Sequence, residues 1–239
     1  MKRQGFSFKR FHIEHDLCAM KVGTDGILLG AWAKVDGAQR VLDIGTGSGL
    51  IALQIAQRSE QHCHITALEI DPQAAQQAKA NVAASPWPDK VSVIEQSVQQ
   101  FAAASNQQYD VIVSNPPYFP AGQVLACQAR ATARHTGSLS KMDLLTAIEQ
   151  LLTPTGRCDM VLPYDVALDY IATATSLGLH LHERVDVVTK ANKPPHRMLF
   201  SLSKTAHKGA HSQLTIHHQE GGYSSEYIAL TSDFYLKMP

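Results

Sequence analysis

An apolar run, Asp110–Ser114, leads directly into the tetrapeptide Asn115-Pro116-Pro117-Tyr118. Two consecutive prolines fix φ and remove backbone donors, so the loop offers rigid carbonyl acceptors. The Asn115 side-chain oxygen and the Pro116 carbonyl can accept both N–H bonds of a planar NH2 group, which localises the nitrogen lone pair for attack on a methyl group. Tyr118 can stack on the planar group, with a contribution of about 1–3 kcal/mol if that group is a base. These residues predict methyl transfer to the conjugated nitrogen of an adenine, a guanine or a glutamine.

A second candidate site lies in the strand, glycine turn and helix start from Val41 to Gly49. Three alternate glycines, Gly45, Gly47 and Gly49, remove Cβ atoms where the chain turns sharply and admit a ligand against bare backbone. Their spacing differs from the dinucleotide fingerprint. The strand also carries Asp43, whose carboxylate would repel a pyrophosphate and attract a sulfonium. The charge argument favours S-adenosylmethionine over NAD as the cofactor.

Polar residues also end the next two strands. Glu69 follows the glycine turn by roughly twenty residues, and its carboxylate can accept hydrogen bonds from both ribose hydroxyls of the cofactor. Asp71 is interpreted as the N-cap of the following helix. Ser97 follows the end of the third strand, and its hydroxyl or a backbone group there is expected to recognise the adenine of the cofactor.

Short β-branched runs alternate with helical patterns along the chain. This alternation predicts a Rossmann-like α/β fold with a seven-stranded, mostly parallel sheet. Only a loop with Pro194-Pro195 separates the last two runs, which predicts an antiparallel strand at one edge, and residues 205–212 are expected to form a mobile loop. The strands are expected at Arg40–Ile44, His64–Ile70, Val91–Glu95, Asp110–Ser114, Cys158–Leu162, Glu183–Val188 and Met198–Ser203. The helices are expected at Leu50–Gln57, Gln73–Ala83, Lys141–Leu152 and Val166–Ser176.

The 239 residues predict one domain (1–239) with an N-terminal extension to about residue 38. No apolar run is long enough for a membrane span, and no signal peptide is recognised. The four cysteines are scattered, which predicts reduced core thiols in a cytoplasmic protein and no metal site. These cysteines are Cys18, Cys63, Cys127 and Cys158.

The formal net charge is zero, which argues against a globally basic nucleic-acid binder. However, residues 111–142 and 187–219 contain no acidic residue and carry several lysines and arginines. If these segments share a face, that face is strongly positive and suits a phosphate backbone. The alternative is a set of unrelated solvated loops.

The motifs D-I-G-T-G-S-G-L-I-A-L and S-N-P-P-Y-F resemble those of the class I amino-methyltransferases. Met20–Trp32 and the tail at 223–236 resemble the bacterial tRNA (adenine-N6)-methyltransferase family that acts on valine tRNA. The resemblance implies the class I methyltransferase fold, S-adenosylmethionine as cofactor, and N6 methylation of the adenine on the 3′ side of the anticodon.

Carried over to this chain, the resemblance implies that the turn glycines, Asp43 and Glu69 bind the cofactor and that Asn115, Pro116, Pro117 and Tyr118 hold the amine. Lys21 to Asp25, Thr24 included, would line the methionine side of the cofactor pocket. From the residues alone, Thr24 or Asp25 is expected to cap a helix at Ile27–Ala33. The RNA contacts are expected at Phe119, Arg130, Arg134, His135, Lys193 and Arg197.

Three alternatives remain open at this point. The tetrapeptide would serve a protein-glutamine N5-methyltransferase equally well. Such enzymes typically carry a separate helical N-terminal domain, and the segment before Arg40 is too short for one. A DNA adenine or rRNA guanine methyltransferase shares the catalytic logic. A non-enzymatic RNA-binding scaffold is disfavoured, since the cofactor acids and the N-P-P-Y loop are intact.

Overall fold

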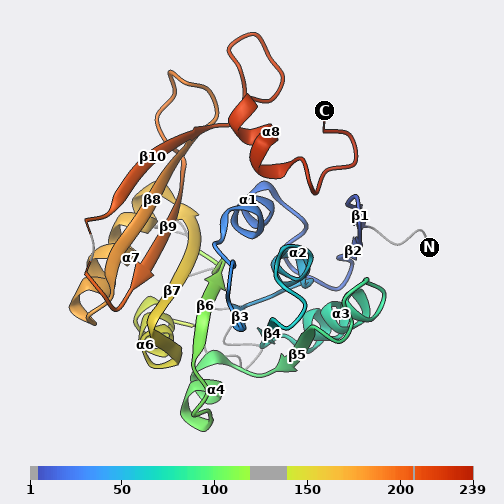
Figure 1. The fold of residues 1–239 in the computed structure, drawn as a ribbon, viewed down its shortest axis with the longest axis vertical. Coiled ribbons are helices and arrows are strands. Elements are labelled where there is room, and N and C mark those ends of the chain that lie inside the picture. Colours follow the sequence, from blue (N-terminus) through green and yellow to red (C-terminus); the bar gives the residue numbers. More distant parts are fainter. Residues whose placement is uncertain (1–4, 119–138, 207, 239) are drawn as a thin grey trace.

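The computed structural model describes residues 5–118, 139–206 and 208–238. These residues form an eight-stranded sheet with helices on both faces (Figure 1), in the strand order β10-β8-β9-β7-β6-β3-β4-β5. The strands are β3 (Arg40–Ile44), β4 (His64–Glu69), β5 (Val91–Glu95), β6 (Tyr109–Ser114), β7 (Leu152–Pro163), β8 (His180–Val188), β9 (Arg197–Ser203) and β10 (Ala210–Thr215). The predicted Rossmann-like α/β fold with a mostly parallel sheet is confirmed, and all seven expected strands are present.

Two details of the predicted sheet are wrong. The antiparallel strand β9 does not lie at an edge, because it pairs with β7 on one side and with β8 on the other. An eighth strand, β10, forms the edge and pairs in parallel with β8 from Ala210↔Glu183 onward. Part of the expected loop at 205–212 is therefore a strand. The run His211-Ser212-Gln213 is exposed and polar, so it lacks the apolar pattern by which the other strands were found.

Helices cover both faces of the sheet. Alternate residues of each strand enter opposite cores: Val41 and Val111 belong to one, while Leu42 and Ile112 belong to the other. This burial of both faces is why the strands read as continuous apolar runs. None of the described helices is long and apolar enough to cross a membrane. One core holds α1 (Thr24–Trp32), α2 (Leu50–Arg58) and α3 (Pro72–Ala83), and the other holds α4 (Val98–Ala104), α6 (Lys141–Leu151) and α7 (Tyr164–Ser176).

The two terminal segments pack against each other beside α1 and α2 (Figure 1). A hairpin of β1 (Gly5–Ser7) and β2 (His12–Glu14) comes first, and the Lys9 amide donates a hydrogen bond of 2.8 Å to the carbonyl of Phe234. Near the C-terminus, α8 (Ser225–Thr231) contacts α1. The helices α4 and α8, each of seven residues, were not expected from the sequence.

Candidate active site

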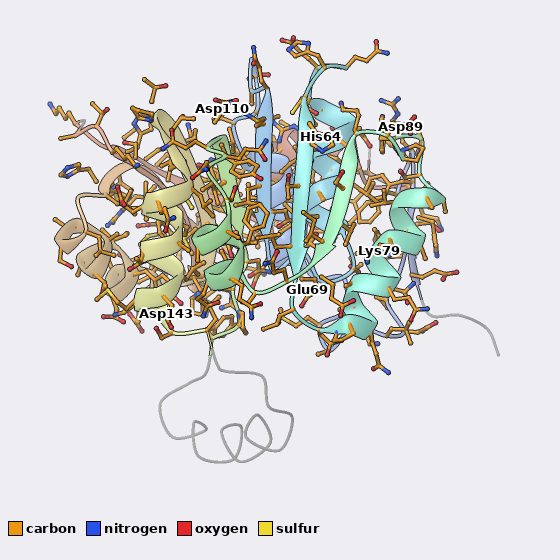
Figure 2. The ribbon with its side chains drawn as sticks, turned by 90° about the horizontal axis from the view of Figure 1, so that it is seen from below. His64, Glu69, Lys79, Asp89, Asp110 and Asp143 are labelled. Carbon is orange, nitrogen blue, oxygen red and sulfur yellow. The ribbon has the colours of Figure 1, made fainter. Side chains whose placement is uncertain are left out.

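The loops after β3, β4, β5 and β6 follow the carboxyl ends of these parallel strands and lie at the same end of the sheet. The register fixes this, because Ile44 pairs with both Leu68 and Ser114. Figure 2 shows Glu69 at this end of the sheet, while His64 and Asp110, near the starts of their strands, lie at the opposite end. A cavity of about 1000 Å³ opens where these loops meet. The carboxyl ends of parallel strands are the general ligand-binding edge of such sheets.

The cavity brings together most of the residues that the sequence singled out. Asp43, Gly49 and Pro116 are buried and do not line it, whereas Lys193 is exposed in the loop between β8 and β9. The expected site residues that line the cavity are Lys21, Thr24, Gly45, Gly47, Glu69, Ser97, Asn115, Pro117, Tyr118 and Arg197. Four expected RNA contacts lie outside the described residues, namely Phe119, Arg130, Arg134 and His135.

The glycine turn after β3 requires glycine for its conformation. Gly45, Gly47 and Gly49 have φ values of 73°, 57° and 84°, in the left-handed region that other residues seldom adopt. The amides of Gly45 and Thr46 both donate to the Leu68 carbonyl at 2.9 Å. A Cβ atom at Gly45 or Gly47 would meet no protein atom within 4 Å, so the backbone here is open to a ligand in the cavity.

Glu69 holds the loops on either side of it. Its Oε2 accepts from the Gly47 amide at 2.8 Å, and its Oε1 accepts from the amides of Ile70 and Asp71 at 2.9 and 3.0 Å. An ionised carboxylate has about four acceptor positions, so these amides leave about one of them for a ligand. Glu69 therefore fixes the shape of the cofactor side before it contacts any cofactor, and its expected grip on both ribose hydroxyls remains a prediction.

Asp43 lies beneath the glycine turn and is fully buried. Its Oδ2 accepts a hydrogen bond of 2.6 Å from the Thr46 hydroxyl, which ties the turn to the strand. Burial raises the pKa of the Asp43 carboxyl to about 7; the Thr46 hydrogen bond opposes this shift, and the nearby charge of Glu69 adds to it. A positive charge in the cavity would favour the ionised form.

The side of the cavity beyond Glu69 contains polar and apolar groups. Ser97 lines it and also caps α4, its Oγ accepting from the Gln100 amide at 3.2 Å. Ile70 is 44% exposed and presents an apolar surface to the cavity, and Gln96 lies beside it in the wall. The sequence analysis missed Ile70 and Gln96, although an apolar residue directly after a strand-end acid was an available signal.

The β6 end places Asn115 next to the glycine turn. The Ser114 hydroxyl donates to the Ile44 carbonyl at 3.0 Å, so the two strand ends are joined just before their loops begin. Asn115 is half-buried in the cavity wall, and Pro116 is buried behind it. The amide that is expected to hold the acceptor nitrogen thus lines the same cavity as the loops that are expected to bind the cofactor.

Tyr118 is fixed by a contact that the sequence did not reveal. Arg197, the first residue of β9, donates from Nη2 to the Tyr118 hydroxyl at 2.8 Å and from Nε to Oδ2 of Asp25 at 2.8 Å. Its guanidinium carbon lies 5.5 Å from the centre of the Tyr118 ring. The three residues come from α1, the loop after β6, and β9, so only the folded chain brings them together.

The segment before α1 forms the remaining wall. Lys21 donates from Nζ to the His15 carbonyl at 2.8 Å, and the Val22 amide donates to His15 Nδ1 at 3.2 Å. The expected side-chain cap of the helix is wrong. The helix begins at Thr24, after a Gly23 N-cap without a side-chain hydrogen bond, so Thr24 and Asp25 already lie in its first turn. In contrast, the predicted cap at Asp71 is confirmed by its hydrogen bonds to the amides of Gln73 and Ala74.

The described site fits S-adenosylmethionine by the chemistry of its groups. Open glycine backbone, a carboxylate with an acceptor position left, and an exposed aliphatic side chain suit an amino acid, a ribose and a base, respectively. Residues 21–163 match the family model of the methyltransferase small domain. Fold and site together define a class I methyltransferase.

Solved structures show the same fold. A predicted O-methyltransferase from Agrobacterium tumefaciens has a TM-score of 0.67 at 19% identity, over 88% of this chain and 96% of that one. A 16S rRNA guanine-N2 methyltransferase from T. thermophilus, solved in complex with AdoMet and guanosine, has a TM-score of 0.57 at 19% identity, over 84% of this chain and 50% of that one.

Much closer relatives carry one name, tRNA1(Val) (adenine(37)-N6)-methyltransferase. The protein from Aeromonas hydrophila is 52% identical over 99% of both chains. The protein from Histophilus somni is 47% identical over 98% of both, and that from Yersinia enterocolitica is 49% identical over 97% of this chain and 92% of that protein. The chain belongs to this family. Membership confirms the resemblance and the predicted methyl-transfer chemistry, with S-adenosylmethionine as the methyl donor.

Proposed function

We propose that the chain methylates N6 of adenine 37, the 3′ neighbour of the anticodon, in tRNA1(Val). The relatives that span the whole chain carry this activity in their name. The observation that carries the proposal is that Gly47, Glu69, Asn115 and Tyr118 line the same cavity. A methyl donor held by the first two would lie beside an amine held by the last two.

The reaction needs positioning more than it needs a base. When bound, S-adenosylmethionine supplies an electrophilic methyl group. Asn115 Oδ1 and the Pro116 carbonyl accept the two N–H bonds of the adenine amine, and this directs its lone pair out of conjugation and toward that methyl group. Tyr118 stacks on the base and excludes water from the reacting nitrogen. Asp43, Gly45, Gly49, Ser97, Lys21 and Thr24 are assigned to the cofactor as direct contacts or as supports of its loops.

RNA is assigned to the rim of the same cavity. The loop of residues 189–196 joins β8 to β9 at the end of the sheet where the cavity opens, because Arg197, which follows this loop, pairs with Pro163 at the carboxyl end of β7. Lys193 is exposed in that loop and is suited to a phosphate contact. The sequence predicts further RNA contacts at Phe119, Arg130, Arg134 and His135, which lie outside the described residues. In this assignment the chain is one cytoplasmic methyltransferase domain that acts on a flipped-out tRNA base without a metal.

The test is a transfer assay with tritiated S-adenosylmethionine and three separate acceptor pools: total tRNA, total rRNA and release-factor protein. We expect label in tRNA, and nucleoside mass spectrometry should find it as N6-methyladenosine in valine tRNA. A tRNA1(Val) transcript with guanine at position 37 serves as the matched control and should stay unlabelled. Label in the protein or rRNA pool alone would contradict the proposal and favour a glutamine or guanine acceptor.

A further inference from the structure

The Arg197 side chain is held at three of its N–H groups. Besides the bonds to Asp25 and Tyr118, Nη1 donates to the carbonyl of His196 at 3.0 Å. Asp25 and Arg197 are both largely buried, with side-chain exposures of 25% and 24%. The planar guanidinium group therefore has one orientation, set by a carboxylate on α1 and by the backbone carbonyl of the residue before it.

This orientation is transmitted to Tyr118. The hydroxyl accepts from Nη2 at 2.8 Å while the cation lies over the ring at 5.5 Å from its centre. One contact fixes the tip of the side chain and the other fixes the tilt of its ring. Tyr118 is the residue that ends the N-P-P-Y tetrapeptide, and it lines the cavity together with Asn115.

We propose that Arg197, braced by Asp25, is a positioning residue that holds the Tyr118 ring in the orientation in which it stacks on the target base. The proposal rests on the proposed function of Tyr118 and deepens it. It gives Arg197 a role different from the phosphate contact that its place in a basic segment suggested. A guanidinium already paired with a carboxylate offers a phosphate little net charge.

The pair of variants that tests this is Arg197→Lys and Tyr118→Phe. Lysine keeps the charge but lacks the fork, so it cannot hold Asp25 and Tyr118 in the same geometry. Phenylalanine keeps the ring and loses only the hydroxyl. We expect each to slow single-turnover methyl transfer at saturating tRNA by a factor of about 10–100, as for a lost charged hydrogen bond. The double variant should be no slower than the slower single one, since both remove the same contact.

Binding measurements separate positioning from RNA contact. We expect Arg197→Lys to change the Kd for tRNA and for S-adenosylmethionine by less than about threefold and to leave the salt dependence of tRNA binding unchanged. The control is Arg184→Lys, because Arg184 is 23% exposed, pairs with Asp186 at 3.2 Å, and does not line the cavity. It should transfer methyl groups at the wild-type rate.

A second readout does not depend on activity. With 3-fluorotyrosine at position 118, the fluorine resonance of the free protein should move in Arg197→Lys and in Asp25→Asn, but not in Arg184→Lys. Asp25→Asn also covers the case in which Arg197→Lys does not fold. An unmoved resonance, or a weaker tRNA affinity with an unchanged transfer rate, would overturn the proposal. Failure of the wild type to label tRNA would instead count against the proposed function.

Discussion

The two halves of the cavity are held together in different ways. On the cofactor side, backbone amides donate to one carboxylate and one carbonyl, and the hydrogen bond from Gly47 to Glu69 spans only 22 residues of sequence. On the substrate side, side chains hold side chains, and the contacts of Arg197 with Tyr118 and Asp25 span 79 and 172 residues. The cofactor half, formed by the loops after β3 and β4, is built within neighbouring strand–turn–helix units and is called the local half. The substrate half, formed by Asn115, Tyr118, Arg197 and Asp25, is complete only when the whole sheet has formed and is called the assembled half.

Because the two halves are built from different contacts, substitutions in them should affect different steps of the reaction. A defect in the local half should weaken cofactor binding and leave RNA binding intact, because the groups that shape it belong to the β3 and β4 loops. A defect in the assembled half should slow transfer and leave cofactor binding intact. Single substitutions in each half, compared for cofactor binding, tRNA binding and transfer rate, test this division.

The largest effect is expected at Asn115, in the assembled half. Asn115→Ala removes one of the two acceptors for the adenine amine, and loss of one such preorganised group costs about 10²–10³-fold in rate. We expect single-turnover transfer to fall by at least this factor. Cofactor affinity, measured by calorimetry, should stay within about threefold of the wild type. An equal loss of binding and transfer would place Asn115 in the cofactor half.

A smaller effect is expected at Glu69, in the local half. In Glu69→Gln, one carboxylate oxygen becomes an NH2 group that must face the amide of Gly47, or those of Ile70 and Asp71, donor against donor. An unsatisfied amide costs about 1–3 kcal/mol, so the Kd for S-adenosylmethionine should rise by up to about 100-fold. The Kd for tRNA should not change, and a parallel loss of tRNA affinity would contradict the division.

The sequence predicted the local half well for a physical reason. Gly45 and Glu69 are recognisable because turn sterics and strand ends leave a signature within a few residues. The tetrapeptide is recognisable for the same reason. The seven apolar strands followed from their burial on both faces, whereas polar β10 did not.

The assembled half was predictable only in part. Arg197 lies in a basic segment, so the sequence suggested RNA, while its partner Asp25 lies in another part of the chain and was read as a helix cap. Charge patterning along a chain does not reveal which charges neutralise each other after folding. The position of β9 inside the sheet was missed for the same reason. Its pairing with β8 on one side and β7 on the other is made only in the folded chain.

Asp43 allows a test of whether the local half depends on charge. Its folded-state pKa is about 7, and the unfolded value is about 3.9, so the folded protein binds this proton more tightly. The stability that this adds is fully present below about pH 4 and is lost as the pH rises toward 7. Asp43→Asn keeps an acceptor for Thr46 and removes the titration.

The free energy of unfolding of the wild type, minus that of Asp43→Asn, should therefore fall by about 2 kcal/mol between pH 5 and pH 7. Urea denaturation without cofactor at the two pH values measures it. Asp89→Asn, at an exposed aspartate (Figure 2), is the control and should show no such difference. A difference that is constant with pH would mean that shape alone holds the turn.

The smallest effect is expected at the rim, where Lys193 is exposed in the β8–β9 loop and its side chain makes no hydrogen bond or ion pair within the described residues. Lys193→Ala should weaken tRNA binding a few-fold and reduce the slope of log K against log salt by up to about 0.9, as for one lost phosphate contact. Transfer at saturating tRNA should be unchanged, because Lys193 fixes neither Tyr118 nor Asn115. Lys79→Ala, on the exposed side of α3 (Figure 2), is the matched control and should leave the slope unchanged. An unchanged slope in Lys193→Ala would move the RNA path away from this loop, and the assembled half would then position the base without contributing to the grip on the tRNA backbone.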